Sequence, residues 1–141
     1  MSPPPLLDVH DLAKSYGGER VVDGVSFAIA PGECLGVIGP NGAGKTTTIR
    51  MCLGLTSPDA GRIRYFARAD GSALEMPRDG LQIRARLGVV AQFESLDPDF
   101  SCAENLYVYG RYFGLKRRQM DARVPGLLDF AALAHKSQAR P

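Results

Sequence analysis

A glycine-rich segment between an apolar run and a helical pattern constrains this chain more than any other feature. The segment fits G-x-x-x-x-G-K-[ST] and comprises Gly39, Pro40, Asn41, Gly42, Ala43, Gly44, Lys45 and Thr46. The apolar run at residues 34–38 predicts a strand that is buried on both faces. From Lys45 onward the apolar spacing predicts a helix that ends at Gly54. A strand, a loop and a helix in this order predict an α/β fold.

The glycine-rich loop has the chemistry that a chain of phosphates requires. Its glycines let successive backbone N–H groups turn inward, and the following helix adds the positive end of its dipole. We expect Lys45 to reach the β- and γ-phosphates of a nucleotide and the Thr46 hydroxyl to bind Mg²⁺. GTPases, kinases and transport ATPases all bind phosphates in this way, so the loop alone does not distinguish them. The alternative is a glycine-rich turn with an exposed lysine.

Further strands are predicted on both sides of this loop. Residues 6–16 and 21–30 have the alternation of two half-buried strands, joined by a glycine pair. Residues 62–66 predict another strand, and the apolar run at 87–91 predicts a short buried one. The polar stretch at 67–80 has no firm periodicity and is expected to lack regular structure.

The last third of the chain has helix signals. Ser101 and Glu104 have the spacing of a capping box, which opens a helix that Gly114 is expected to end. Residues 120–128 continue with the spacing of a second helical face, in which Pro125 should cause a kink or begin a new helix.

Composition excludes several classes of protein. With 141 residues and 45% hydrophobic residues, the chain has room for one domain with a buried core. The net charge of +2 argues against a nucleic-acid partner, because such a partner requires a strongly basic face. No apolar run has the length of a transmembrane helix and the first residues lack signal-peptide features, so a cytosolic location is expected. Cys34, Cys52 and Cys102 form no pair with motif spacing and are predicted to be reduced and mostly buried.

Residues outside the loop make a family resemblance specific. They are Tyr16 with Gly17, the strand with Val21 and Val22, the whole string 39–48, and Gln92 after the predicted strand at 87–91. From about Leu6 to its end, the chain resembles the N-terminal part of an ABC-transporter ATP-binding domain. The resemblance implies one incomplete domain over 1–141. It would comprise an antiparallel β subdomain at 6–30, a P-loop NTPase core at 34–92 and the start of a helical subdomain at 93–141.

The resemblance also implies roles for individual residues. ATP would be held by the loop residues, Thr47 included, and by Tyr16, whose ring would stack on the adenine. Gln92 would join Thr46 at Mg²⁺ and contact the surroundings of the attacking water. The alternatives are a strand-end Tyr16 with its hydroxyl in water and a Gln92 without function.

The segment from Leu96 to Gly114 is similar to the export-type branch of the family, which includes nodulation-factor exporters, with drug and polysaccharide exporters nearby. This likeness implies an integral membrane permease subunit as partner, a second ATP-binding subunit in a homodimer, and a place at the cytoplasmic face of the inner membrane. In such transporters this segment faces the permease, and the exported substrate would be a lipo-oligosaccharide.

Other properties of this part of the chain have simpler explanations. Most of its aromatic residues are expected to form the core of the helical part itself, namely Phe93, Phe100, Tyr107, Tyr109, Tyr112 and Phe113. Glu94, Asp97 and Asp99 are expected to form a capped, solvated loop rather than a metal site. The basic residues at 84, 86 and 116–118 are expected to form solvated helix surface, with an anionic partner as the alternative.

Two family motifs are missing from the sequence. It contains no Asp-Glu dipeptide, which in the family holds Mg²⁺ and activates water, and no Leu-Ser-Gly-Gly signature. We therefore expect roughly the first half of such a domain, without turnover on its own, marginally stable or aggregating because a sheet edge is left unpaired. A nucleotide-binding module without turnover and a P-loop kinase or soluble ATPase are the alternatives.

Overall fold

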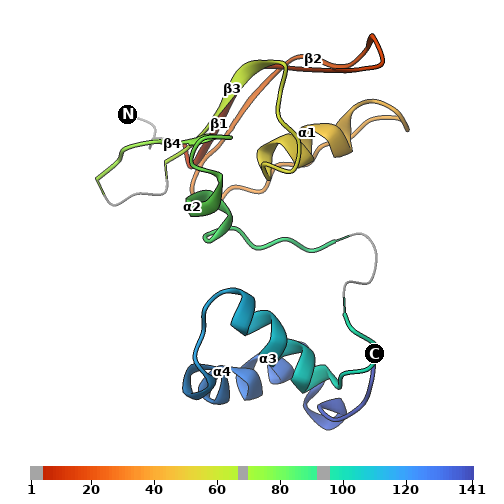
Figure 1. The fold of residues 1–141 in the computed structure, drawn as a ribbon, viewed down its shortest axis with the longest axis vertical. Coiled ribbons are helices and arrows are strands. Elements are labelled where there is room, and N and C mark those ends of the chain that lie inside the picture. The colour runs from red at the N-terminus through yellow and green to blue at the C-terminus, as the bar shows by residue number, and fades with distance from the viewer. Residues whose placement is uncertain (1–4, 67–69, 92–95) are drawn as a thin grey trace. The chain divides into compact units, whose positions relative to one another are not determined.

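The computed structural model describes residues 5–66, 70–91 and 96–141 and forms two compact units, Met1–Gly88 and Val89–Pro141. The first unit contains β1 (Leu7–Tyr16), β2 (Glu19–Ile29), α1 (Lys45–Cys52), β3 (Ala60–Tyr65), β4 (Leu74–Met76) and α2 (Gly80–Arg84) (Figure 1). The second contains α3 (Cys102–Tyr112), α4 (Arg117–Phe130) and the short 3-10 helix η1 (Ala134–Lys136). The subdomain limits predicted from the sequence stay a prediction.

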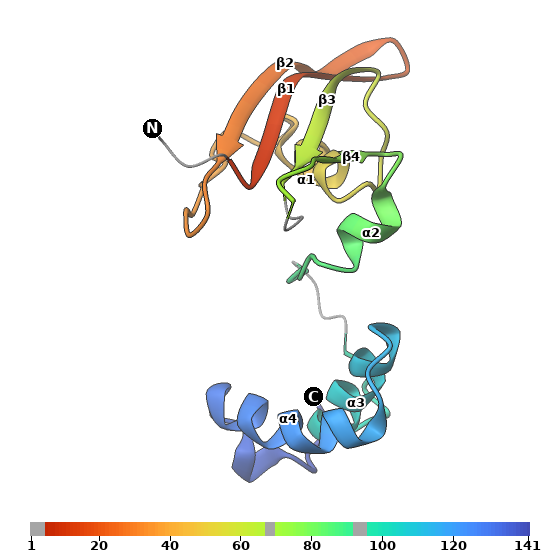
Figure 2. The ribbon, with the colours of Figure 1, turned by 90° about the vertical axis from the view of Figure 1, so that its left-hand side faces the viewer.

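The strands of the first unit form an antiparallel sheet with the order β2-β1-β3-β4 (Figure 2). The predicted pair of N-terminal strands is confirmed as the hairpin β1–β2. Its two-residue turn consists of Gly17 and Gly18, whose φ angles of 57° and 86° lie in the region that glycine adopts without steric cost. The alternation predicted for β2 is also confirmed, since Phe27 is half-buried and its neighbour Ser26 is exposed.

Helix α1 packs against this sheet through its C-terminal half. Met51 and Cys52 are buried with Val9, Leu12 and Ile63 in one hydrophobic core. The predicted end of the helix is confirmed, because Gly54 has a left-handed φ of 67° and its N–H donates to the carbonyl of Met51 at 3.0 Å. The apolar face of α1 thereby fixes its axis against the sheet and leaves the N-terminal end exposed.

The two predicted buried strands at 34–38 and 87–91 are wrong for this structure. Both segments have no regular secondary structure, and Ile38 and Val90 are 96% and 100% exposed. An apolar run becomes a buried strand only when other strands pair with its backbone and side chains cover its faces. Within the described residues no strand pairs with either segment. For the same reason Cys34 is exposed rather than buried, whereas Cys52 is buried and Cys102 is half-buried, and all three are free thiols.

The region at 67–80 contains structure that the sequence pattern did not predict. Residues 67–69 lie outside the described part, but β4 pairs with β3 through Met76 opposite Ile63 and Leu74 opposite Tyr65. With three residues β4 is too short for alternation to be recognised. The strand at 62–66 is confirmed as β3, which begins two residues earlier than predicted, at Ala60.

The second unit confirms the predicted helix signals. Ser101 caps α3 and forms a capping box with Glu104, and Gly114, with a φ of 72°, follows the end of the helix. Helix α4 runs through Pro125 as one helix, so no new helix begins there. A Cβ at Gly110 on α3 would meet the flexible end of the Met120 side chain on α4, which would have to shift. The two helices therefore approach each other closely at this point.

The predicted aromatic core of the helical part is wrong in three positions, since Phe100, Tyr112 and Phe113 are 37%, 78% and 58% exposed. Tyr107 and Tyr109 are half-buried, Tyr107 packs against the core, and Phe93 lies outside the described residues. The core is built from smaller side chains, namely Ala103, Met120, Val124 and Leu128. Cys102, Leu106, Tyr107 and Leu115 are partly buried and pack against this core. Among the described residues no helix is long and apolar enough to span a bilayer.

Candidate nucleotide-binding site

The loop at 39–44 connects the exposed segment after β2 to the first turn of α1. Gly44 is buried at the N-cap of α1 with a φ of 80°, and residues 39–43 are exposed. A Cβ at Gly44 would collide with the backbone carbonyl of Val21 and lie 3.0 Å from Cγ2 of Val22. The second glycine of the motif thus permits the loop to pack directly on β2, while the first part of the loop faces solvent.

Lys45 folds back over the loop that precedes it. Its Nζ donates to the carbonyl oxygens of Gly39 at 2.7 Å and Pro40 at 2.6 Å. The Ala43 N–H donates to the same Pro40 carbonyl at 3.3 Å. The loop is therefore wrapped around an ammonium group, for which phosphate oxygens are stronger, charged acceptors than the two carbonyls.

The N-terminus of α1 is arranged to attract an anion. Gly44 provides no side-chain cap, and no acidic residue lies in the first turn. The first N–H groups of the helix and its dipole consequently act on whatever occupies the loop. Thr46 is exposed and Thr47 is half-buried. These donors fit a polyphosphate.

The same residues fit Mg²⁺ only as part of a nucleotide complex. No group of three or more histidine, cysteine, aspartate or glutamate side chains that could hold a metal occurs in the described part of the chain. Mg²⁺ in nucleotide sites retains water and is bound by one or two protein oxygens together with phosphates. The Thr46 hydroxyl would supply such an oxygen, and the ion would neutralise charge on the phosphates.

Tyr16 lies at the end of β1, at the tip of the hairpin. Its backbone pairs with Glu19 on β2, the strand whose Val21 and Val22 contact the loop at Gly44. The side chain is 50% exposed, and the ammonium of Lys14 lies 5.5 Å from the centroid of its ring. The ring is thus accessible. Strand β2 contacts both the end of β1 that carries Tyr16 and the loop at Gly44.

Asp59 supports this strand end, a contact that the sequence did not predict. Its carboxylate accepts hydrogen bonds from Nζ of Lys14 at 2.6 Å and from the Ser15 N–H at 2.7 Å. The hydrogen bond from Lys14 is the main cause that lowers the pKa of Asp59, and the Ser15 N–H adds to it. More than forty residues separate the partners along the chain, so no local spacing reveals the contact.

Gln92 lies outside the described residues, as do Phe93 and Glu94, so the predicted role of Gln92 stays a prediction. The turn at 97–100 is held by Asn105, which sequence reasoning also missed. Its buried amide donates to the carbonyls of Asp97 and Phe100 at 2.9 and 3.2 Å and accepts from the Asp97 N–H at 2.9 Å. The Asp97 carboxylate in turn accepts from the Asp99 N–H at 2.9 Å. Asp97 and Asp99 therefore belong to a hydrogen-bonded turn, as predicted.

Known proteins similar to this chain share its sequence along nearly its whole length. A Nod factor export ATP-binding protein I from Paraburkholderia xenovorans is 53% identical over 98% of this chain, and one from Ralstonia nicotianae is 50% identical over 96%. One from Rhizobium leguminosarum bv. viciae is 44% identical over 97%. The chain spans only 40 to 43% of the length of these relatives.

A solved structure supports the same relationship. The ATP-binding subunit of an ABC transporter superimposes with a TM-score of 0.77 and 31% identity, over 96% of this chain and 54% of that one. This likeness confirms the expected fold class. The family model for ABC transporters matches residues 22–141, which include the loop, α1 and the whole helical unit. On these grounds the chain belongs to the ABC transporter family, as its resemblance predicted.

Proposed function

We propose that this chain provides the ATP-binding loop of a nucleotide-binding subunit in an export-type ABC transporter. The observation that carries the proposal is the loop at 39–44, wrapped around Nζ of Lys45 at the uncapped N-terminus of α1. Similarity to proteins named for Nod factor export favours a lipo-oligosaccharide or a similar substrate. Drug and polysaccharide exporters remain the alternative.

The residues of this chain would act mainly by binding and orientation. Backbone N–H groups of the loop and Lys45 would hold the phosphates, Thr46 would hold Mg²⁺, and Tyr16 would stack on the adenine. Gln92, which follows residues 87–91 in the sequence, would contact Mg²⁺. The family hydrolyses ATP, but the 141 residues contain neither an Asp-Glu dipeptide nor a Leu-Ser-Gly-Gly signature. We therefore propose that this chain alone binds ATP without turnover.

The remaining parts of the proposal concern partners. ABC ATP-binding subunits work as pairs with membrane permease subunits, and we propose the same assembly, a homodimer on a permease at the cytoplasmic face of the inner membrane. The composition gives no basis for a nucleic-acid partner.

Calorimetric titration of the chain with ATP and Mg²⁺ tests the proposal. Lys45→Ala should weaken binding by about a hundredfold, because a charge-assisted contact to phosphate is lost and the loop loses its central donor. Lys136→Ala is the matched control, since Lys136 is exposed on η1 in the other unit. Equal ATP affinities of the unchanged chain, Lys45→Ala and Lys136→Ala would contradict the assigned role of the loop. Phosphate release at ordinary ATPase rates would contradict binding without turnover.

A further inference from the structure

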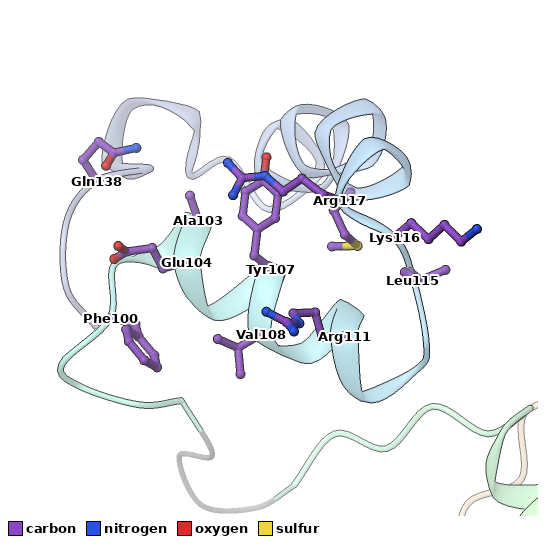
Figure 3. A pocket seen from close by; sticks show the side chains of 11 residues that line it. Phe100, Ala103, Glu104, Tyr107, Val108, Arg111, Leu115, Lys116, Arg117 and Gln138 are labelled. Carbon is purple, nitrogen blue, oxygen red and sulfur yellow. The ribbon is translucent and has the colours of Figure 1, made fainter.

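Two charged side chains, Lys14 and Asp59, meet beside Tyr16 at the end of β1. Neither belongs to the loop at 39–44 or to the residues proposed to touch the nucleotide. The groove of about 870 Å³ along α3 (Figure 3) differs in this respect, because the resemblance of residues 96–114 already implies a surface toward the permease. The charged pair at β1 therefore needs an explanation of its own.

Asp59 forms hydrogen bonds with three consecutive residues of β1. Its N–H donates to the Ala13 carbonyl at 2.9 Å, and one oxygen of its carboxylate accepts from the Ser15 N–H at 2.7 Å. The other oxygen accepts from Nζ of Lys14 at 2.6 Å. Because two of these contacts are made to the backbone of a strand, the carboxylate has a fixed place from which it holds the ammonium.

Lys14 is held over the ring of Tyr16. Its Nζ lies 5.5 Å from the ring centroid, within the distance of about 6 Å over which a cation is attracted to an aromatic face. Only 16% of the Lys14 side chain is exposed, so the ammonium is partly shielded from solvent. It thus occupies one side of the ring and leaves the other side to a ligand.

The same lysine lies close to the phosphate loop in the register of the sheet. Lys14 is opposite Val22 on β2, and Cγ2 of Val22 lies 3.0 Å from the place that a Cβ at Gly44 would take. All of these residues belong to the first compact unit. The pair of Lys14 and Asp59 is therefore placed to act on the base end of a nucleotide whose phosphates lie in the loop.

An aromatic side chain at a strand end has to be ordered when a base stacks on it, and this ordering lowers affinity. A contact that orders the ring before the ligand arrives removes part of that loss. The ammonium of Lys14 provides such a contact only while it is held in place. The carboxylate of Asp59 holds it there.

We propose that Asp59 is a positioning residue for the adenine contact: it holds Lys14 on one side of the Tyr16 ring, so that the base stacks on the other side. Asp59 acts through Lys14 and Tyr16 without touching the nucleotide. This inference rests on the proposed ATP binding with Tyr16 as the stacking residue. A direct contact of Lys14 with the nucleotide fits less well, because its ammonium is already paired with a carboxylate.

Calorimetric titration of the whole chain with ATP and with inorganic triphosphate, each with Mg²⁺, tests the proposal. Asp59→Asn removes the charge that holds Lys14, while asparagine keeps an oxygen for the Ser15 N–H. It should weaken ATP binding about fivefold, the effect of ordering one side chain on binding, and leave triphosphate binding unchanged. The matched control is Asp23→Asn, which removes a carboxylate from the exposed pair with Arg20 and should retain both affinities.

Variants of Lys14 show whether the two residues act through one contact. Lys14→Met should cause the same loss of ATP affinity as Asp59→Asn, and the double variant should lose no more than either single one. Lys14→Arg should retain the affinity for ATP, because arginine keeps the charge and also binds to aromatic faces. A merely structural role of Asp59 would lower the affinities for ATP and triphosphate together.

Proton NMR detects the contact directly. A nuclear Overhauser effect between the Tyr16 ring protons and the side-chain methylene protons of Lys14 is expected in the unliganded chain. It should be lost in Asp59→Asn and persist when ATP is added, because the base takes the other side of the ring. Its loss on addition of ATP to the unchanged chain would show that the base displaces the lysine and would overturn the proposal.

Three titration results would also overturn it. They are an unchanged ATP affinity in Asp59→Asn, equal losses for ATP and triphosphate, and a loss in Lys14→Met that Asp59→Asn does not share. Far-UV circular dichroism confirms that each variant is folded. ATP binding that is weakened in Lys45→Ala but retained in Asp59→Asn would overturn this inference alone, whereas no ATP binding by the unchanged chain would overturn the proposed function as well.

Discussion

Gly44 has a position in which two independent constraints exclude any side chain. Its φ of 80° is strained for other residues, and a Cβ would collide with the Val21 carbonyl of β2. Gly44→Ala should therefore lower the free energy of unfolding of the first unit by about 2–3 kcal/mol and abolish nucleotide binding. Urea unfolding followed by circular dichroism measures the first effect, and calorimetry the second.

The control for this prediction is Gly32→Ala. Gly32 has nearly the same φ, 77°, but no atom lies within 4 Å of the place of its Cβ. We expect a cost of about 1 kcal/mol from the backbone conformation alone. If both variants lost the same stability, contact with Val21 would not be what excludes a side chain at Gly44.

Tyr16 allows the adenine contact to be separated from the phosphate contact. Its half-exposed ring should contribute about 1–3 kcal/mol by stacking on a base. Tyr16→Ala should therefore weaken ATP binding by about tenfold or more. In competition titrations the affinity for inorganic triphosphate should stay unchanged. Tyr112→Ala, at an exposed position of the helical unit, is the control. Equal losses for ATP and triphosphate would remove the stacking role.

The sequence predicts a site residue when that residue belongs to a contiguous motif. It does not predict residues that stabilise the site through contacts made only in the folded chain. Lys45 and Gly44 stand within one motif, and the structure places them together in one loop. Asp59 and Asn105 have no motif, because Asp59 joins a strand more than forty residues earlier and the amide of Asn105 supports a turn only through the folded backbone. Only coordinates reveal such contacts.

The capping box of α3 gives a prediction for the helix as an element. The Ser101 N–H and hydroxyl both donate to the Glu104 carboxylate, and this lowers the pKa of Glu104 in the folded state. The stabilisation is thus present at neutral pH and is lost as the pH falls through the lowered pKa, because the protonated carboxyl accepts these bonds poorly. The melting temperature of the helical unit should fall between about pH 5 and pH 3.

Glu104→Gln isolates this contribution from other carboxylates. Glutamine retains the spacing of the capping box but does not titrate. The pKa of Asp121 is also lowered, mainly by the Tyr107 hydroxyl, and its titration is common to both proteins. The difference in melting temperature between the unchanged chain and Glu104→Gln, followed against pH, therefore measures the contribution of the Glu104 carboxylate. A difference that stays constant from neutral to acidic pH would contradict the prediction.

Elements with local end signals were predictable, and elements that depend on neighbours were not. Ser101, Gly114 and Gly54 mark helix ends by their own backbone chemistry, so α1 and α3 have nearly the predicted limits. The runs at 34–38 and 87–91 have the composition of strands but no partner among the described residues. The period of a sequence indicates a propensity for strand structure, whereas pairing is a property of the surrounding chain.

For the whole molecule, we expect these two unpaired runs to lower the solubility. Both are uncharged and mostly exposed, with Val90 and Ile38 almost fully accessible and only Leu87 half-buried. Such segments promote association through backbone pairing. Val90→Lys should reduce light scattering of the chain on heating without a change in the stability of the helical core, because Val90 is fully exposed. Scattering against temperature and circular dichroism measure the two quantities.

Phe130→Lys is the matched control for a change from apolar to charged. Phe130 is 92% exposed but lies at the end of α4, outside any strand-like run. If exposure alone caused association, both substitutions would reduce scattering equally. A sharp cooperative melt of a monomeric chain at ordinary temperatures, without any substitution, would contradict the expectation of marginal stability altogether.

The hydrogen bonds between Lys45 and the carbonyls of Gly39 and Pro40 also set a threshold for ligand entry. An incoming anion has to compete with both carbonyls, which accept two of the three hydrogen bonds that the ammonium can donate. Chloride is a single atom, whereas a triphosphate has several oxygens in a row that can take the places of both carbonyls. We therefore expect the loop to favour ligands with several acceptor oxygens over the simple salts of the cell.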